Sequence, residues 1–326
     1  MPLTRRGFVA GGGAATAEAL AGFAVRPYGG APVLFGIYGG PGCYARPELA
    51  AFERWLGRRV ELVVDFGEYR RGWRGMTEQA GWLTQCWRAG AGVPRLVLGV
   101  PMLMQGDDSR ALRRGAEGAH DGSFRQLARL LSNARRGDTI LRLGWEFNGS
   151  WYAWSAAADP AAFAAYWRRI VGTMRAAAPE ARFLFDWNPA LGAESAERAY
   201  PGDDVVDVIG LDAYNQTWPA MAEPERRWSY LLDHPTGLRW HHDFAMARGK
   251  PRSFPEWGTG TRPDGLGGGD DPLYIRNMFA WFRAGGPPVL YHCYWNAATA
   301  EYDSKVTANK FSRATAALRA ELLARP

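Results

Sequence analysis

Short apolar runs rich in β-branched residues alternate with longer amphipathic segments from about residue 32 to the end of the chain. Continuous apolar runs are typical of strands that are buried on both faces, as in parallel sheets. The pattern therefore predicts eight buried strands. They are expected at residues 32–38, 60–66, 95–100, 139–145, 182–187, 206–214, 251–257 and 288–295.

The segments between these runs have the apolar spacing of helices, and several open with Asp, Ser or Pro, where caps and first-turn prolines are favoured. Eight strands, each followed by helical sequence, predict an α/β fold: a single (β/α)8 TIM barrel over residues 32–326, with no second domain. An open doubly wound sheet is the alternative, but no G-x-G-x-x-G follows the first run. The clearest helices are expected at 47–58, 123–136, 159–179, 271–285 and 313–325.

The first 31 residues have features of an export signal. Arg5 and Arg6 precede a small-residue, mildly apolar run, and residues 19–21 (ALA) form a candidate processing site. Glu18 departs from such signals, and a basic start followed by a flexible Ala/Gly arm is the alternative. We expect a twin-arginine-type signal and linker over 1–31, with export to the periplasm or beyond. No apolar stretch elsewhere reaches the roughly 18 residues needed to span a bilayer, so we expect no membrane span.

The composition favours a folded protein that is rich in tryptophan. With 47% hydrophobic residues, a 326-residue chain can bury a substantial core. The formal net charge is +6, but Arg and Lys are interspersed with acids, so we expect no nucleic-acid partner. The 15 tryptophans, several of them beside Asn, Asp or Glu, suit sugar faces. The excess of basic residues is compatible with an acidic exopolysaccharide as the substrate. We expect the protein to be a monomer.

No metal or cofactor is predicted. Cys43, Cys86 and Cys293 cannot all pair and match no zinc or redox spacing, so we interpret them as buried or incidental thiols. The five histidines, including His241 and His242, show no metal-ligand spacing with carboxylates.

Polar and aromatic residues gather at the carboxyl ends of the predicted strands, where (β/α)8 barrels carry their active sites. A ring of such residues on one rim indicates a substrate-binding surface, although any single member can be a loop contact. The candidates for substrate binding are Tyr38, Asp65, Asn148, Asp186, Trp187, Asn188, Trp257 and Trp295.

Two glutamates end predicted strands that face each other across the barrel mouth. Glu146 follows the fourth apolar run, and Glu256 lies in the seventh. Carboxylates about 5–5.5 Å apart suit retaining glycoside hydrolysis, in which one attacks the anomeric carbon while the other protonates the leaving oxygen and later activates water. The strand positions therefore suit a double displacement by two Glu, but they do not give the distance between the two carboxyl groups.

Four segments resemble glycoside hydrolase family 26, the β-mannanase-like group within the larger clan of retaining (β/α)8 hydrolases. E-x-N-G-x-W after a strand, followed 110 residues later by P-E-[WF]-G, is specific as a combination. The resemblance implies an endo-acting hydrolase of a β-linked polysaccharide: a mannan, a β-glucan or a bacterial exopolysaccharide. The segments are WEFNGSWYAW (145–154), VDVIGLDAYN (206–215), FPEWG (254–258) and YWN (294–296).

Carried over position by position, the resemblance implies Glu146 as general acid/base and Glu256 as nucleophile. Tyr214 would hydrogen-bond the nucleophile and hold its orientation; a satisfied core tyrosine is the alternative. Trp151 and Trp295 would be sugar-stacking platforms, with a surface brace as the alternative for Trp151.

Trp145 departs from the family pattern, because family 26 enzymes usually carry His before the acid/base and the wider clan usually carries Asn. An indole there should alter recognition near the reacting carbon, so mannan specificity does not follow from the resemblance. We expect Trp145 to supply a stacking wall, with Asn188 or Asp186 taking over the lost hydrogen bond. Asn148 would help to fix the loop or a substrate hydroxyl.

The aromatic surroundings also bear on the acid. Apolar rings disfavour the charged form of a carboxyl, so Phe147 and its aromatic neighbours would raise the pKa of Glu146. Glu256 needs polar surroundings, and Arg142 is a candidate neighbour.

Two other functions compete with hydrolysis. A non-catalytic polysaccharide-binding or export-assisting protein on the same barrel would keep binding after Glu256→Gln, which should abolish hydrolysis. Another barrel enzyme, of aldolase or phosphate-handling type, needs a strand-end Lys for Schiff-base chemistry. Lys250, Lys305 and Lys310 all lie outside the predicted strand cores.

Overall fold

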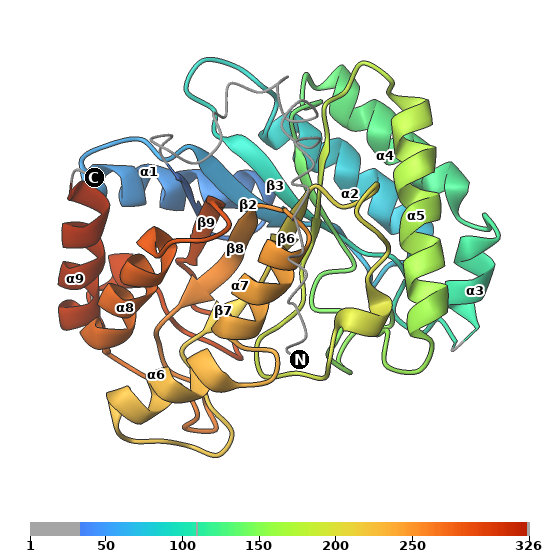
Figure 1. Ribbon diagram of the computed structural model, residues 1–326. Coiled ribbons are helices and arrows are strands. Elements are labelled where there is room, and N and C mark those ends of the chain that lie inside the picture. Colours follow the sequence, from blue (N-terminus) through green and yellow to red (C-terminus); the bar gives the residue numbers. More distant parts are fainter. Residues whose placement is uncertain (1–32, 109, 325–326) are drawn as a thin grey trace, which may run out of the picture. The chain divides into compact units, whose positions relative to one another are not determined.

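The computed structural model describes residues 33–108 and 110–324 (Figure 1). The predicted export signal and linker lie outside these residues. Within the two described ranges, no helix combines the length and hydropathy that crossing a bilayer requires.

A parallel sheet closes into a barrel. Its strand order is β6-β5-β4-β3-β2-β1-β9-β8-β7, and a further pairing of β6 with β8 completes the ring. The predicted run 206–214 is divided into two short strands, β6 and β7, which together fill one position, so the predicted eight-position (β/α)8 barrel is confirmed. The strands of the described chain are β1 (Leu34–Tyr38), β2 (Leu62–Phe66), β3 (Arg95–Val100), β4 (Ile140–Leu143), β5 (Leu184–Trp187), β6 (Val208–Gly210), β7 (Ala213–Tyr214), β8 (Arg252–Gly258) and β9 (Val289–Trp295).

Helices follow seven of the eight barrel positions in the described chain, and the fifth is the exception. The connection from β5 to β6 holds only a short 3-10 helix, η2 (Glu197–Ala199). Pro189 and Pro201 lie in this connection, and proline interrupts helices. The helices are α1 (Arg46–Leu56), α2 (Gly72–Cys86), α3 (Ala111–Ala116), α4 (Asp121–Asn133), α5 (Pro160–Ala177), α6 (Pro224–Asp233), α7 (Leu238–Ala247), α8 (Pro272–Arg283) and α9 (Ser312–Leu323).

The strands present alternate residues to the barrel interior and to the surrounding helices, because successive side chains of a strand point to opposite faces. On β9, Tyr291 reaches Asp186 of β5 inside the barrel, whereas His292 stacks against Phe282 of α8 outside it. This alternation decides which strand-end residues can reach the mouth.

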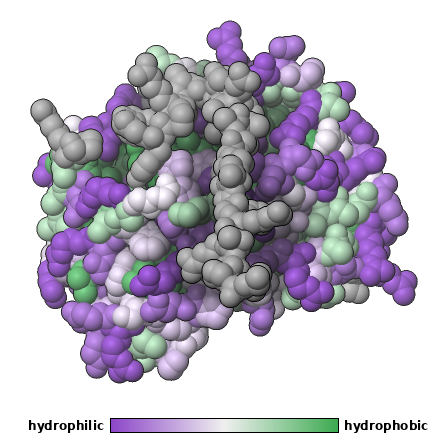
Figure 2. All heavy atoms as spheres, in the orientation of Figure 1, coloured by the Kyte–Doolittle hydropathy of each residue, from purple (hydrophilic) through white to green (hydrophobic). Residues whose placement is uncertain are grey.

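The surface in Figure 2 is mostly hydrophilic, with hydrophobic residues in separate patches. A few large apolar side chains of the described chain remain exposed. Among them are Tyr44, Trp151 and Trp218, which all follow strands in sequence.

A disulfide joins Cys43 and Cys86, which lie 43 residues apart, whereas Cys293 is a buried free thiol. The interpretation as buried or incidental thiols is therefore wrong for Cys43 and Cys86, whereas Cys293 is such a buried thiol. Asp65 explains the approach of the two segments: its Oδ2 accepts hydrogen bonds from Gly42 N and Trp87 Nε1, the neighbours of the two cysteines. Sequence spacing does not reveal such a tertiary contact.

Candidate active site

Glu146 lies just beyond β4 in an unusual backbone conformation. Its φ is +54°, which non-glycine residues adopt rarely, and Gly144 before it has φ +55°. Glu146 N donates to the carbonyl of Asn188 (2.8 Å), and Gly149 N donates to the carbonyl of Glu146 (2.9 Å). Such strain costs on the order of 1 kcal/mol and persists where the surroundings fix it, often at active sites.

The carboxyl group of Glu146 is held in surroundings that favour its protonated form. Burial, and then the charge of Glu256, raise the pKa of Glu146 to about 7. Trp151 opposes this shift, because its Nε1 donates to Glu146 Oε2 over 2.8 Å. Glu146 can therefore hold and release a proton near neutral pH.

Glu256 lies on β8, and donors from two other strands hold both of its carboxylate oxygens. Arg142 Nη2 donates to Oε1 over 2.6 Å, and the Tyr214 hydroxyl donates to Oε2 over 2.7 Å. The first bond is charge-assisted, which makes it the stronger kind. Glu256 is 5% exposed, so the carboxylate has a fixed orientation in a nearly dry environment.

Arg142 on β4 connects three strands beneath the mouth. Its Nε donates to Asn188 Oδ1 (2.6 Å), and Nη2 also donates to Asp212 Oδ2 (2.6 Å). Burial raises the pKa of Asp212 well above its usual range. Although burial opposes its charge, Asp212 and Glu256 raise the pKa of Arg142 above its ordinary value. One cation thus faces two carboxyl groups.

Aromatic side chains line the mouth beside these glutamates. Tyr38 stacks on Trp295 at 4.1 Å between ring centroids, and Tyr214 meets Trp295 edge-on at 5.9 Å. Phe66 at the end of β2 contacts Tyr38, Trp295 and, at 5.2 Å, Trp145. Tyr38 and Trp295 keep partial exposure, so a sugar ring can reach this group.

Trp145 is a buried part of the same aromatic group and is only 3% exposed. Its ring packs against Phe66, Tyr152 and Trp154, and its Nε1 donates to the Tyr152 hydroxyl over 3.0 Å. The indole is therefore enclosed by the protein's own aromatic rings, and its one donor is already used within the protein. Trp151, by contrast, is 55% exposed beside Glu146.

Three predicted substrate-binding residues point away from the mouth. Asp65 faces the helices and binds Gly42 and Trp87, as described above. Trp187 is fully buried against Phe244 of α7, and Trp257 is fully buried with its Nε1 donating to His292 Nδ1. Successive side chains of a strand point alternately into the barrel and toward the helices, and these three residues occupy positions that face the helices. A position near the end of a strand does not by itself show which way the side chain points.

Two further predicted residues are committed to the fold around the site. Asp186 lies deep inside the barrel, where it accepts hydrogen bonds from Ser253 and Tyr291, and burial raises its pKa to about 6. Asn148 is buried and bridges to Ala190 through both its amide and its carbonyl, which fixes the loop after β4.

Asn188 also belongs to this buried network, because its side-chain Oδ1 accepts a hydrogen bond from Arg142 Nε. Phe66 and Tyr152 were not predicted as site residues, whereas Asp212 belongs to the polar residues at the end of the sixth predicted strand. No group of three or more His, Cys, Asp or Glu residues in the ranges 33–108 and 110–324 is arranged to hold a metal ion.

Comparison with known proteins finds a family whose model matches part of this chain. Residues 123–228 match the model of glycosyl hydrolase family 26, a range that contains Glu146 and Tyr214. A mannan endo-1,4-beta-mannosidase of Bifidobacterium adolescentis is 26% identical over 225 residues. That alignment covers 59% of this chain and 22% of the relative, so the match spans less than a quarter of the larger protein.

Solved structures share the fold. A Bacillus subtilis mannanase superimposes with a TM-score of 0.60 at 18% identity, covering 87% of this chain and 84% of the other. An endo-beta-1,4-mannanase from Cellulomonas fimi gives a TM-score of 0.61 at 18% identity, covering 86% and 70%. At such identities the likeness concerns the fold. Together with the family match, it confirms the predicted resemblance to glycoside hydrolase family 26 on a (β/α)8 barrel.

Proposed function

We propose that this chain, which resembles glycoside hydrolase family 26, is a retaining glycoside hydrolase. The observation that carries the proposal is the different environment of two neighbouring carboxyl groups. Burial raises the pKa of Glu146 to about 7, whereas Glu256 is bonded through both oxygens to Arg142 and Tyr214. Two carboxyl groups in different environments are typical of an acid and a nucleophile in one site.

In the first step, a carboxylate oxygen of Glu256 attacks the anomeric carbon. The glycosidic C–O bond breaks, and the proton of Glu146 passes to the departing oxygen, leaving a glycosyl ester on Glu256. Tyr214 and Arg142 keep the nucleophile in place during the attack, so it does not have to be reoriented. The aromatic rings of Tyr38 and Trp295 lie where they can face the sugar.

In the second step, Glu146 is ionised and acts as a base. It removes a proton from a water molecule, whose oxygen attacks the anomeric carbon and displaces Glu256. The sugar leaves with its original anomeric configuration, and both glutamates return to their starting states. The exposed ring of Trp151, bonded to Glu146, is placed to contact the sugar on the leaving side.

We propose endo action on a β-linked polysaccharide: a mannan, a β-glucan or a bacterial exopolysaccharide. Mannan is a candidate because the B. adolescentis relative is a mannan endo-1,4-beta-mannosidase. The β-glucan and the bacterial exopolysaccharide are equally strong candidates, because the indole nitrogen of Trp145 is hydrogen-bonded to Tyr152 and offers the sugar no donor.

A reducing-sugar screen over mannans, β-glucans, xylans and bacterial exopolysaccharides tests this function. Glu256→Gln and Glu146→Gln should each abolish turnover of the natural substrate, whereas the surface variant Glu78→Gln should retain it. With an activated aryl glycoside, azide should rescue Glu146→Gln and yield a glycosyl azide of retained configuration. Glycan binding without turnover by the wild type would instead support the non-catalytic binding protein.

We also propose that the protein is exported and acts as a monomer. The Cys43–Cys86 disulfide supports export, because such bonds persist in oxidising compartments. Changing Arg5 and Arg6 to Lys should leave the protein in the cytoplasm, and export of this variant would contradict the first proposal. Light scattering should give the mass of one chain, and the mass of a dimer would contradict the second.

A further inference from the structure

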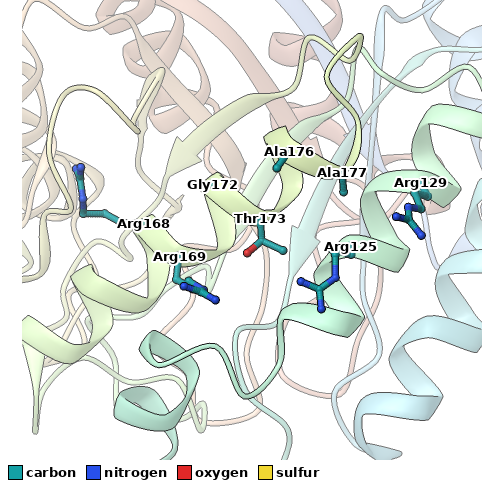
Figure 3. A pocket seen from close by; sticks show the side chains of 8 residues that line it. All are labelled: Arg125, Arg129, Arg168, Arg169, Gly172, Thr173, Ala176 and Ala177. Carbon is teal, nitrogen blue, oxygen red and sulfur yellow. The ribbon is translucent and has the colours of Figure 1, made fainter.

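A groove on the outer helices carries an excess of positive charge. It lies between α4 and α5, has a volume of about 420 Å³ and shares no lining residue with the site around Glu146 and Glu256. We propose that this groove binds an anionic, carboxylate-bearing polysaccharide. Its lining residues are Arg125, Arg129, Arg168, Arg169, Gly172, Thr173, Ala176 and Ala177 (Figure 3).

The arginines of the groove outnumber the carboxylates that pair with them. Arg169 Nη2 donates to Asp121 Oδ2 over 2.5 Å, and Arg125 lies 3.7 Å from the same oxygen, so these two cations share one carboxylate. Arg129 forms no ion pair with any described residue.

Arg168 is neutralised separately, because it forms two bonds of 2.7 Å with Asp204. Four arginines against two carboxylates leave a net charge of +2 at this groove. In Figure 3 Arg168 points away from the other three arginines, so the excess charge belongs to the group of Arg125, Arg129 and Arg169.

The floor of the groove lets a ligand approach closely. Gly172, Ala176 and Ala177 of α5 have little or no side chain, and a Cβ on Gly172 would meet no atom within 4 Å. Guanidinium groups on both walls can then form paired hydrogen bonds with planar carboxylates. Arg125 and Arg129 are one turn apart on α4, about 6 Å, which suits two charged groups on one strand of polymer.

The choice of a polysaccharide rests on the proposed function, whereas the anion site itself does not. A single-stranded nucleic acid is disfavoured, because none of the eight lining residues is aromatic and such ligands are usually held by base stacking. The groove would bind one part of a long acidic polysaccharide, while the site around Glu146 and Glu256 acts on another part of the same polymer.

Binding of polygalacturonic acid to the full-length protein at low ionic strength tests the proposal, with its fully methyl-esterified form as the uncharged control. Arg125→Gln with Arg129→Gln should weaken binding at least about fivefold. Arg54→Gln with Arg88→Gln removes the same charge from other exposed positions and should change binding less than about twofold. The esterified polymer should bind poorly to every variant.

Three results would overturn the proposal: equal loss in both double variants, unchanged binding in the groove variant, or tighter binding of a DNA oligonucleotide than of the polyuronate at this groove. All measurements are repeated in the Glu256→Gln background, in which the polymer should not be hydrolysed during the binding assay. If no glycan is hydrolysed but the groove variant still loses polyuronate binding, the proposed hydrolase fails while the groove stands. Turnover without groove binding would instead support the hydrolase and overturn the groove.

Discussion

The hydroxyl of Tyr214 donates a 2.7 Å hydrogen bond to Oε2 of Glu256, and Arg142 holds the other oxygen of the same carboxylate. Two strands thus fix a carboxylate that belongs to a third strand, the proposed nucleophile. The carboxylate cannot rotate without breaking one of these hydrogen bonds.

Replacing Tyr214 by Phe should lower kcat/KM without unfolding the protein. The ring and its edge contact with Trp295 remain, and only the hydroxyl is lost. A hydrogen bond to a charged group contributes about 1.5–3 kcal/mol, which corresponds to a roughly 10- to 150-fold decrease. Steady-state kinetics on the polysaccharide identified by the screen would measure it.

Tyr200→Phe is the matched control, because its hydroxyl also donates to a carboxylate, that of Asp203, over 2.7 Å, but at the surface. It should leave kcat/KM unchanged. Equal effects of the two substitutions would show that Tyr214 has no special role in holding Glu256.

Removing the cation at Arg142 should destabilise the protein strongly. In Arg142→Met, Asp212 and Glu256 would be buried without a positive partner, and breaking a buried pair in this way costs about 3–5 kcal/mol. Urea unfolding would measure the loss. The deficit should shrink at low pH, where Asp212, whose pKa burial raises, binds a proton. Arg113→Met, which breaks an exposed pair with Asp159, should cost about 1 kcal/mol or less; a similar loss in both variants would contradict the argument.

Much of this fold could be predicted from hydrophobic pattern alone, because parallel barrel strands are buried on both faces and appear as continuous apolar runs. The pattern did not reveal that the connection after β5 lacks an α-helix. Nor did it reveal the division between β6 and β7, because the interrupting residues Leu211 and Asp212 are themselves buried.

The site was predictable to the level of strand ends but not to the level of side-chain direction. Tyr38 and Trp295 face the mouth, whereas Trp187 and Trp257, equally near strand ends, point toward the helices. A shift of one residue along a strand turns a side chain from the barrel mouth toward the helices. The role of Arg142 depends on contacts with residues 46, 70 and 114 positions away, which no local pattern contains.

The pH dependence of turnover should reflect the proton of Glu146. Its pKa is raised to about 7, and the first step needs the protonated form, so kcat/KM should fall as pH rises through about 7. Trp151 donates to the ionised carboxylate and thereby lowers this pKa. In Trp151→Phe the alkaline limb should therefore move to higher pH.

A pH profile of kcat/KM for both proteins would measure this shift, and Trp154→Phe provides a control because its indole nitrogen donates to the backbone carbonyl of Trp145 and not to a carboxylate. An alkaline limb that stays in place in Trp151→Phe, or moves to lower pH, would contradict the assignment of Glu146 as the acid.

The Cys43–Cys86 disulfide should stabilise the protein mainly by restricting its unfolded chain. The two cysteines are 43 positions apart, and a disulfide that closes a loop of this length is expected to contribute about 2–4 kcal/mol to the free energy of unfolding. Reductant should therefore lower the urea midpoint of the wild type to that of Cys43→Ala with Cys86→Ala, and should leave the double variant unaffected. Cys293→Ala should keep the full response to reductant, because Cys293 takes no part in the bond. Since Cys43 is exposed, reductant can reach it in the folded protein, and an unchanged midpoint after complete thiol labelling would show that the cross-link adds no stability.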